Sequence, residues 1–200
     1  QDLGFIHAAD KKIVLLKQAS KENYDTIQAA IDAVAAGEDA IIQIPAGTYS
    51  EPLKISNTSS RTIILKGASA DVSAYSNGGV RSSEETILTG GIEVNGLLED
   101  DSLEINGLTL HGKGINIVGW GAPIISSGSI RIVNNVITNI TDKSISAIHI
   151  NCGSDEYLDT VNLKNNYIDN IGEEGYASNG VYSTLPVRAM YISGNYIGNV

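Results

Sequence analysis

The sequence contains a single cysteine, Cys152, so no internal disulfide bond can form and a disulfide-stapled fold is excluded. No stretch approaches the roughly 20 apolar residues that a membrane-spanning helix requires, so we expect no insertion into a bilayer. Phenylalanine, methionine and tryptophan each occur once, and there are only 4 prolines. The interior must therefore be built mainly from small aliphatic side chains, among which isoleucine is abundant.

Positive charge is also scarce, since 13 Lys and Arg residues face 23 Asp and Glu residues, which gives a formal net charge of -10. Nucleic acid is an unsuitable partner, because its phosphates require a basic face. A polyanionic sugar is disfavoured as well, unless cations bridge the two surfaces. A neutral glycan, or one bound through calcium, fits the charge better.

The second half of the chain carries a motif with paired asparagines that recurs. It reads IRIVNNVITNI from Ile130, VNLKNNYIDNI from Val161 and MYISGNYIGNV from Met190, with a looser copy, LEINGLTLHG, from Leu103. Equivalent positions are separated by 27, 31 and 29 residues. A near-constant period that contains short alternating strands is typical of a solenoid.

Each repeat predicts two strands around an asparagine corner, because asparagine tolerates left-handed backbone and hydrogen-bonds its own turn. Stacked asparagines of successive coils are expected to form an amide ladder. A third strand lies between the copies, beginning near Gly91, Gly114, Ala147 and Gly180. Three strands per turn predict an all-β fold, a right-handed parallel β-helix with three sheets. A β-sandwich would not explain the recurring corner.

The N-terminal part differs from the repeats and divides the chain into three segments. Residues 1–23 contain a short apolar run that predicts a strand covering the first coil. Residues 24–37 predict an amphipathic helix with Asp25 as N-cap and Gln28 in a variant capping box. Its apolar stripe comprises Ile27, Ala30, Ile31 and Val34. We expect this helix to cap the β-helix of residues 38–200.

The opening of the solenoid resembles a known superfamily. Ile42–Glu51 reads IQIPAGTYSE, Ile63–Gly67 reads IILKG and Thr86–Gly91 reads TILTGG. This order, after a helix, is similar to the opening of pectinesterase-type and related pectin lyase-like β-helices. The resemblance covers roughly residues 24 to 200 and implies the β-helix fold with a substrate cleft on one sheet and its flanking loops.

The catalytic signatures of those enzymes do not carry over. The paired-aspartate segments of pectinesterases are missing, as are the NTD, GHG and RIK segments of polygalacturonases. Asp100 and Asp101 form an isolated pair in a predicted turn. The segment Leu185–Arg188 is only weakly similar to the arginine region of pectate lyases. The resemblance thus implies a fold without identifying an activity.

The predicted strand alternation nevertheless indicates which of the three sheets would bind a ligand. Inward isoleucines in the third strand leave Glu93, Asn116, His149 and Tyr182 pointing outward in one row, to which Lys54 is expected to belong. Longer loops flank this strand on both sides in the later coils, whereas the asparagine corner carries no insertion there. The loops are therefore expected to wall a groove over this row.

Aromatic and polar side chains give the predicted groove a chemistry suited to sugars. Trp120, Tyr157, Tyr176 and Tyr182 could stack on pyranose rings, while Glu93, Asn116 and His149 could bond hydroxyl groups. For each aromatic residue, anchoring a loop to the coil is an equally good interpretation. His149 has the pKa range of a general base but no identifiable partner, so a structural role is the stronger expectation.

No cofactor is implied by the sequence. Calcium stays open, because Asp155, Glu156 and Asp159 are acidic, although they lack the spaced oxygens of a calcium loop. A solvated acidic turn is the better interpretation of these residues.

Three functions remain in order of preference. The first is an extracellular or cell-surface scaffold or adhesin that binds a glycan without catalysis. The second is a polysaccharide lyase or glycoside hydrolase, and the third is a purely structural spacer. The coil Met190–Val200 is followed by no covering helix. We therefore expect a longer parent chain with further domains, or association through this coil.

Overall fold

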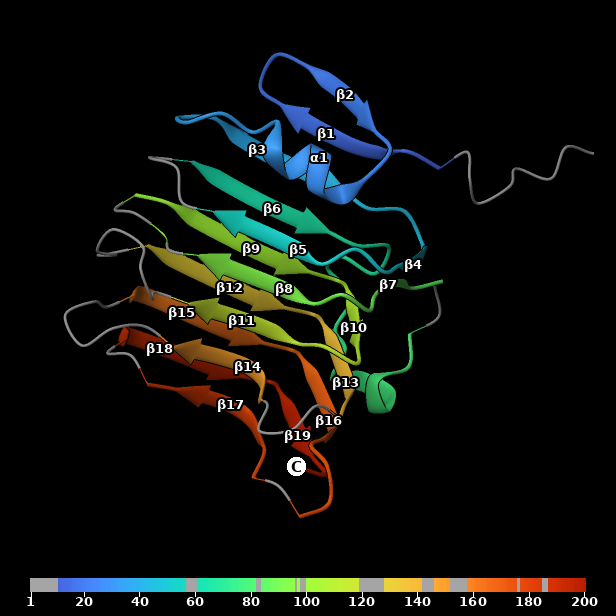
Figure 1. The fold of residues 1–200 in the computed structure, drawn as a ribbon, viewed down its shortest axis with the longest axis vertical. Coiled ribbons are helices and arrows are strands. Elements are labelled where there is room, and N and C mark those ends of the chain that lie inside the picture. The colour runs from blue at the N-terminus through green and yellow to red at the C-terminus, as the bar shows by residue number, and fades with distance from the viewer. Residues whose placement is uncertain are drawn as a thin grey trace, which may run out of the picture.

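The computed structural model describes residues 11–56, 61–81, 84–95, 97, 100–118, 128–141, 146–151, 158–175, 177–184 and 187–200. The fold is predominantly β, and its strands stack in layers along the long axis of the molecule (Figure 1). Three sheets form, and pairing between successive coils is parallel throughout. This arrangement is consistent with the β-helix solenoid that the repeat period predicts.

The largest sheet, sheet A, has eight strands in the order β18-β15-β12-β9-β6-β3-β1-β2. Only β1 is antiparallel to its neighbours β2 and β3, so the predicted N-terminal strand does pair with the first coil. The strands of sheet A are β1 (Ile13–Lys17), β2 (Lys21–Tyr24), β3 (Asp39–Gln43), β6 (Thr62–Lys66), β9 (Ser102–Asn106), β12 (Ser129–Val133), β15 (Leu158–Lys164) and β18 (Val187–Ser193).

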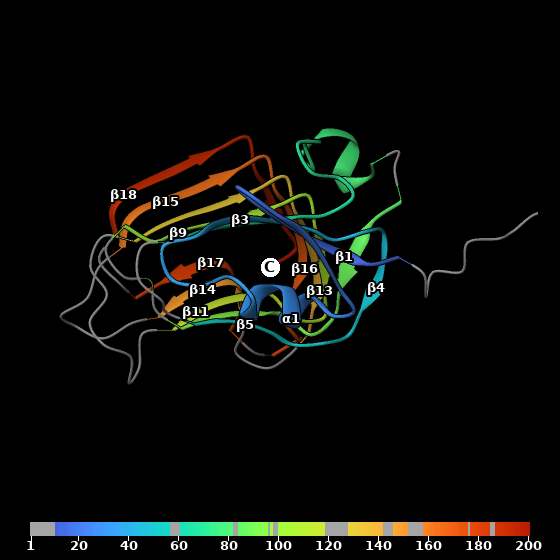
Figure 2. The same cartoon turned by 90° about the horizontal axis from the view of Figure 1, so that it is seen from above.

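Sheets B and C complete each turn of the chain. Sheet B contains β4 (Gly47–Tyr49), β7 (Thr86–Leu88), β10 (Thr109–His111), β13 (Val136–Ile140), β16 (Tyr167–Ile171) and β19 (Tyr196–Gly198). Sheet C contains β5 (Leu53–Ser56), β8 (Ile92–Asn95), β11 (Ile115–Val118), β14 (Ser146–Asn151) and β17 (Asn179–Ser183). Each coil from β3-β4-β5 to β15-β16-β17 takes one strand from each sheet, and β18 and β19 add one further strand to sheets A and B, which confirms the predicted three strands per turn (Figure 2).

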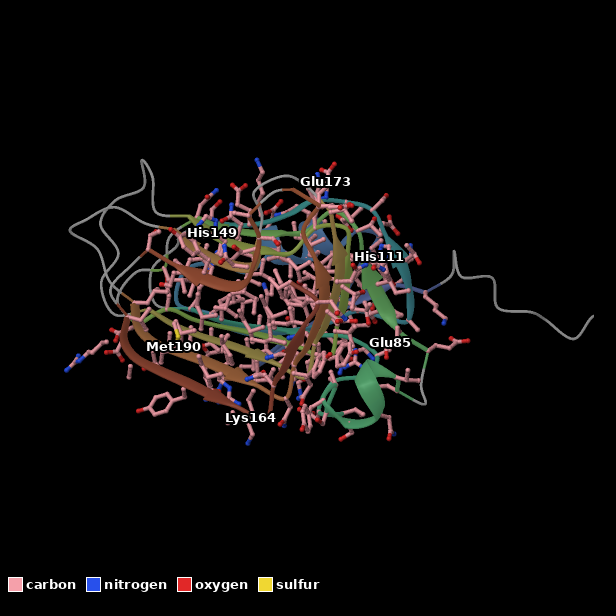
Figure 3. The ribbon with its side chains drawn as sticks, turned by 90° about the horizontal axis from the view of Figure 1, so that it is seen from below. Glu85, His111, His149, Lys164, Glu173 and Met190 are labelled. Atoms are coloured by element: carbon pink, nitrogen blue, oxygen red, sulfur yellow. The ribbon has the colours of Figure 1, made fainter. Side chains whose placement is uncertain are left out.

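Aliphatic columns run through the interior that the sheets enclose, and side chains fill this space (Figure 3). Alternate side chains of each strand point inward, and parallel register places them directly above one another. In sheet A, one fully buried column contains Ile42, Leu65, Ile105 and Ile132. Branched aliphatic residues suit such a narrow stack, which accounts for the abundance of isoleucine.

The predicted asparagine corner and its amide ladder are confirmed. Asn134 and Asn165 adopt left-handed backbone with φ of 59° and 56°. The side-chain oxygen of Asn166 accepts from the backbone and side-chain nitrogens of Asn135 at 3.0 and 3.2 Å. Asn195 accepts from Asn166 in the same way at 2.9 Å. Each ladder amide therefore satisfies the corner of the coil before it.

The predicted helix is shorter than expected. Helix α1 spans Ile27–Asp32, and its N-cap is Thr26 rather than Asp25, with the Thr26 side chain accepting from the Ala29 amide. Tyr24, the first residue of the predicted helix, ends β2 instead, because it pairs with Ile13 in a hairpin with β1. Lys17 Nζ donates to the Ala33 carbonyl at 2.9 Å, which satisfies the helix end where the helix stops.

The apolar face of α1 is buried as the stripe predicts. Ile27, Ala30 and Ile31 belong to the core cluster, as does Val34 just beyond the helix. The carboxylate of Glu51 accepts from the amides of Ile27 and Gln28 at 2.8 and 3.2 Å. The glutamate that ends the IQIPAGTYSE segment thus holds the start of α1.

The asparagine corner is not bare, which corrects the sequence expectation. Between β6 and β7, residues 67–81 and 84–85 extend along this corner (Figure 1). These residues are here called the corner arm. The Ala74 amide donates to Asn165 O at 3.0 Å, and Asp71 bonds Asn106 through backbone and side chain at 2.9 Å. The arm includes a short 3-10 helix, η2 (Ser76–Gly79).

A nearly buried ion pair holds the base of the corner arm. The Arg81 side chain is 1% exposed and binds both oxygens of Glu85 at 2.7 Å. Arg81 also donates to the carbonyls of Leu108, at 3.2 Å, and Asn134. An arm that begins in the second coil therefore contacts the three coils that follow, which sequence periodicity gave no means to predict.

Candidate functional site

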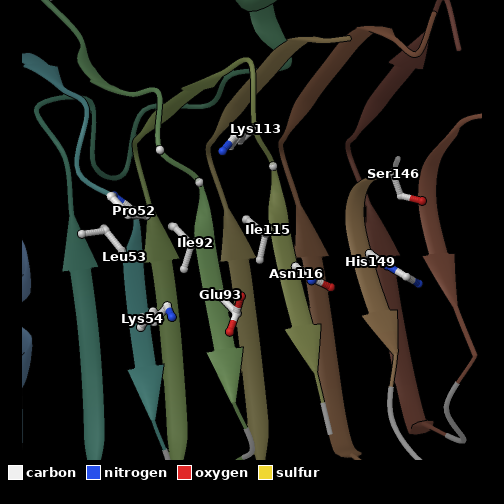
Figure 4. Close-up of a pocket in the computed structure, with 13 residues that line it drawn as sticks. Pro52, Leu53, Lys54, Ile92, Glu93, Lys113, Ile115, Asn116, Ser146 and His149 are labelled. Atoms are coloured by element: carbon white, nitrogen blue, oxygen red, sulfur yellow. The ribbon is translucent and has the colours of Figure 1, made fainter. Parts of the chain in front are cut away.

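The outer face of sheet C carries the predicted row of polar side chains in register. Lys54 pairs with Glu93, Glu93 with Asn116, Asn116 with His149, and His149 with Tyr182. The five residues belong to β5, β8, β11, β14 and β17, and Figure 4 shows the first four side by side on their strands. The register prediction is confirmed, including the addition of Lys54.

Alternation along the strands places this row opposite the core. The neighbouring inward positions Ile92, Ile115 and Ile148 are at most 1% exposed. Tyr182 is 44% exposed, whereas the side chains of Asn116 and His149 are only partly exposed. The row therefore faces out of the core as predicted, but its middle is more shielded than an open strand surface would be.

A pocket of about 330 Å³ lies over the first four of the five residues of the row, from Lys54 to His149. Its polar lining comprises Lys54, Glu93, Lys113, Asn116, Ser146 and His149 (Figure 4). The lining carries two ammonium groups and one carboxylate, so its local charge is positive, whereas the net charge of the whole chain is negative. The volume is at the small end for ligand pockets, which is suitable for a single sugar ring of a longer chain.

Glycines at tight corners of the chain form one edge of the pocket. A Cβ atom on Gly114 would lie 2.1 Å from the carbonyl oxygen of Ala147, so this position accepts no side chain. Gly91, one coil earlier, has a φ of 75°, which favours glycine. Successive coils consequently approach each other closely at this edge of the pocket.

His149 is the most perturbed group of the row. Burial lowers its pKa from the usual 6.5, so the ring is neutral at physiological pH. Its Nε2 atom is buried and has no hydrogen-bond partner, and its ring lies 5.3 Å from that of Tyr182 with a tilt of 46°. Glu93 lies two strands away, at about 9.6 Å, so the two groups do not form an acid–base pair.

Several predicted site residues fall outside the part of the chain that the structure describes. These are the aromatic residues Trp120, Tyr157 and Tyr176 and the acidic residues Asp155 and Glu156. Asp159 is described, and its carboxylate binds Arg188 at 3.1 Å. Among the described residues, no group of three or more His, Cys, Asp or Glu side chains is placed to hold a metal ion.

Sequence reasoning missed Lys113, which lines the pocket from the corner before β11, and Ser146, the first residue of β14, which precedes the expected start of the third strand at Ala147. Only strand positions were considered for the row, because alternation assigns a direction to strand residues and says nothing of corner residues. A useful signal was available, since Lys113 directly precedes the glycine that begins the third strand.

Comparison of this chain with models of known families, with curated proteins and with solved structures finds no match. Within the described residues, no helix has the length and apolar character needed to cross a bilayer.

Proposed function

We propose that this chain is a β-helix domain that binds a glycan along the outer face of sheet C without catalysing a reaction. The observation that carries the proposal is the in-register row of Lys54, Glu93, Asn116, His149 and Tyr182, which meets a pocket at one end. A scaffold or adhesin of the cell surface or extracellular space is the setting that suits this function.

The geometry of the row supports an extended carbohydrate chain. Neighbouring strands are about 4.8 Å apart, so the row offers a new polar contact at each such step along the stack. Amide, imidazole, carboxylate and ammonium groups bond hydroxyl groups, and the exposed ring of Tyr182 offers an apolar face for a pyranose. This order of contacts suits a chain of linked sugars better than a compact ligand.

Glycan-array binding, run with calcium and with a chelator, tests the proposal. We expect binding to at least one neutral glycan, with loss of signal for the variant Tyr182→Ala. Arg131→Ala is a matched control, because Arg131 is an exposed residue on the outer face of sheet A. An array without any bound glycan in either condition would refute the function.

We further propose that the stack is right-handed, that its fold is that of the pectin lyase-like superfamily, and that α1 with β1 and β2 caps its first coil. The IQIPAGTYSE segment, three sheets with three strands per turn and the buried face of α1 support this assignment. A crystal structure would test the handedness, and deletion of residues 11–36 would test the cap through exposure of the first coil.

A polysaccharide lyase or hydrolase is the alternative, and the neutral His149 in a pocket with two lysines is the observation that favours it. A neutral imidazole can accept a proton, and ammonium groups can stabilise developing negative charge. Incubation with polysaccharides and measurement of new reducing ends would reveal such an activity. Its loss in His149→Gln would assign the site.

A further inference from the structure

We propose that Asn116 and His149 form a subsite for one hydroxyl group of a neutral sugar. The inference rests on the proposed glycan binding and makes it more specific. Asn116 Oδ1 and His149 Nε2 are both buried and find no hydrogen-bond partner among the residues that the structure describes. The two residues are direct register partners on β11 and β14, and both line the pocket of sheet C.

Two such atoms on paired residues of neighbouring strands are unusual, because buried polar groups in folded proteins nearly always find partners. Leaving them unpaired lowers the stability of the fold. The neighbouring side chains of the row do not relieve this, and Tyr182 offers His149 a ring contact without a hydrogen bond. A bound group that pairs with both atoms would account for their retention in a pocket.

The chemistry of the two atoms specifies the bound group. The amide oxygen of Asn116 only accepts a hydrogen bond, whereas Nε2 of a neutral histidine donates one in the appropriate tautomer. A hydroxyl group can donate to the first and accept from the second. Its oxygen can lie about 2.8 Å from each atom, since the two strands are only about 4.8 Å apart.

A carboxylate would fit this pair poorly. It has no proton to donate, so its oxygen would meet the amide oxygen of Asn116 with like partial charges. Calcium would pair with the amide oxygen but would oppose a donating imidazole. In the orientation that presents Asn116 Oδ1 and a donating His149 Nε2, the pair therefore favours a neutral sugar hydroxyl over a carboxylate or calcium.

Access to the two atoms requires a small movement. Both side chains are partly exposed although the atoms themselves are shielded. The terminal torsions of asparagine and histidine have broad minima related by a half turn. Rotation about either torsion would turn the shielded atom of that residue toward the pocket.

The chain offers a matched control in Asn162 of β15. Its Oδ1 atom is also buried without a partner, but it lies on the outer face of sheet A, between Arg131 and Tyr191. Replacing Asn162 by leucine removes an unpaired polar atom of the same kind outside the groove. The control separates the effect of an unpaired atom on stability from an effect on binding.

The experiment measures binding and thermal stability of wild-type protein, Asn116→Leu, His149→Leu and Asn162→Leu. The probes are neutral hexasaccharides of glucose, mannose and galactose and an acidic hexasaccharide of galacturonic acid, titrated by calorimetry. We expect wild-type protein to bind a neutral probe. Both groove variants should lose about tenfold or more in affinity while keeping or raising their melting temperatures, and Asn162→Leu should bind as wild-type protein does.

The outcomes distinguish the two proposals. Wild-type affinity in both groove variants would overturn the subsite and leave glycan binding intact, and so would binding of the acidic probe alone. Lower melting temperatures of both groove variants would show that the atoms are paired in solution, which also overturns the inference. Absence of binding by wild-type protein to these probes and to every glycan of the array would overturn the proposed function and this subsite with it.

Discussion

The asparagine corner and the outer row of sheet C use the same kinds of side chain in opposite ways. At the corner, Asn166 is fully buried, and its amide oxygen and nitrogen bond Asn135, Asn195 and the carbonyl of Ile132. In the row, Asn116 is only partly buried, yet its amide oxygen has no partner. At the corner, the side-chain amide is paired within the chain, whereas the amide oxygen of Asn116 in the row is unpaired among the described residues.

The difference follows from the local backbone. A corner turns the chain and leaves amide and carbonyl groups without strand partners, so a side-chain amide beside them finds both. A strand in the middle of a parallel sheet has its backbone groups already paired, so an outward amide meets only the side chains above and below. The same residue type therefore stabilises a corner and stays available on a strand.

Replacing Asn166 by leucine should have the largest effect. The change removes the side-chain bonds to the Asn135 amide and to Ile132 O, while Asn195 Oδ1 keeps the backbone amide of residue 166, so we expect a loss of about 2–6 kcal/mol in the free energy of unfolding. Urea unfolding followed by circular dichroism measures it. Asn162→Leu, the control on a strand, should change this free energy by less than about 1 kcal/mol. Equal effects of the two variants would contradict the comparison.

Replacing Arg81 by methionine tests whether the corner also depends on the corner arm. The change leaves the shielded Glu85 carboxylate without its cation, so we expect a loss of about 2–3 kcal/mol. Hydrogen exchange at the Ala74 amide, which bonds Asn165 O, should accelerate. Arg131→Met is the control, because its ion pair with Glu104 is 51% exposed on the arginine side, and we expect less than about 1 kcal/mol there. A protected Ala74 amide in Arg81→Met would show that the arm is held by other contacts.

Replacing Ile192 by lysine tests the surface of the coil Met190–Val200. Ile192 is 57% exposed, whereas Leu163, its register partner in the coil before, is 2% exposed. We expect wild-type protein to self-associate through this apolar surface and the open edge of β18. Ile192→Lys should remain monomeric in sedimentation velocity at high concentration. A monomeric wild-type protein under the same conditions would remove the basis for this expectation.

The pH dependence of stability gives the smallest expected effect. Burial lowers the pKa of His149 below 6.5, so the unfolded chain binds more protons than the folded chain between the two pKa values. The free energy of unfolding should therefore fall as pH drops below 6.5, until pH passes the lowered pKa. The difference in the free energy of unfolding between wild-type protein and His149→Leu, measured at each pH, isolates the contribution of His149. A difference that is flat from about pH 5 to about pH 8 would show that His149 is solvated in both states.

The sequence by itself determined the period, the in-and-out pattern and the register of the row from Lys54 to Tyr182. These properties depend on strand alternation and on a repeated corner, and both are local, so a single chain displays them without its fold. The left-handed conformation of Asn134 and Asn165 was predictable for the same reason, because it reflects the intrinsic tolerance of asparagine.

Only the tertiary structure decided which polar atoms are satisfied and which segments meet across coils. Glu51 holds the start of α1, and Arg81 bonds carbonyls of two later coils, although neither contact has a signature in sequence spacing. The pocket likewise joins Lys113, from the corner before β11, and Ser146, at the start of β14, to the row. Such contacts depend on the path of the chain in space, since residues far apart in sequence become neighbours only after the coils have stacked.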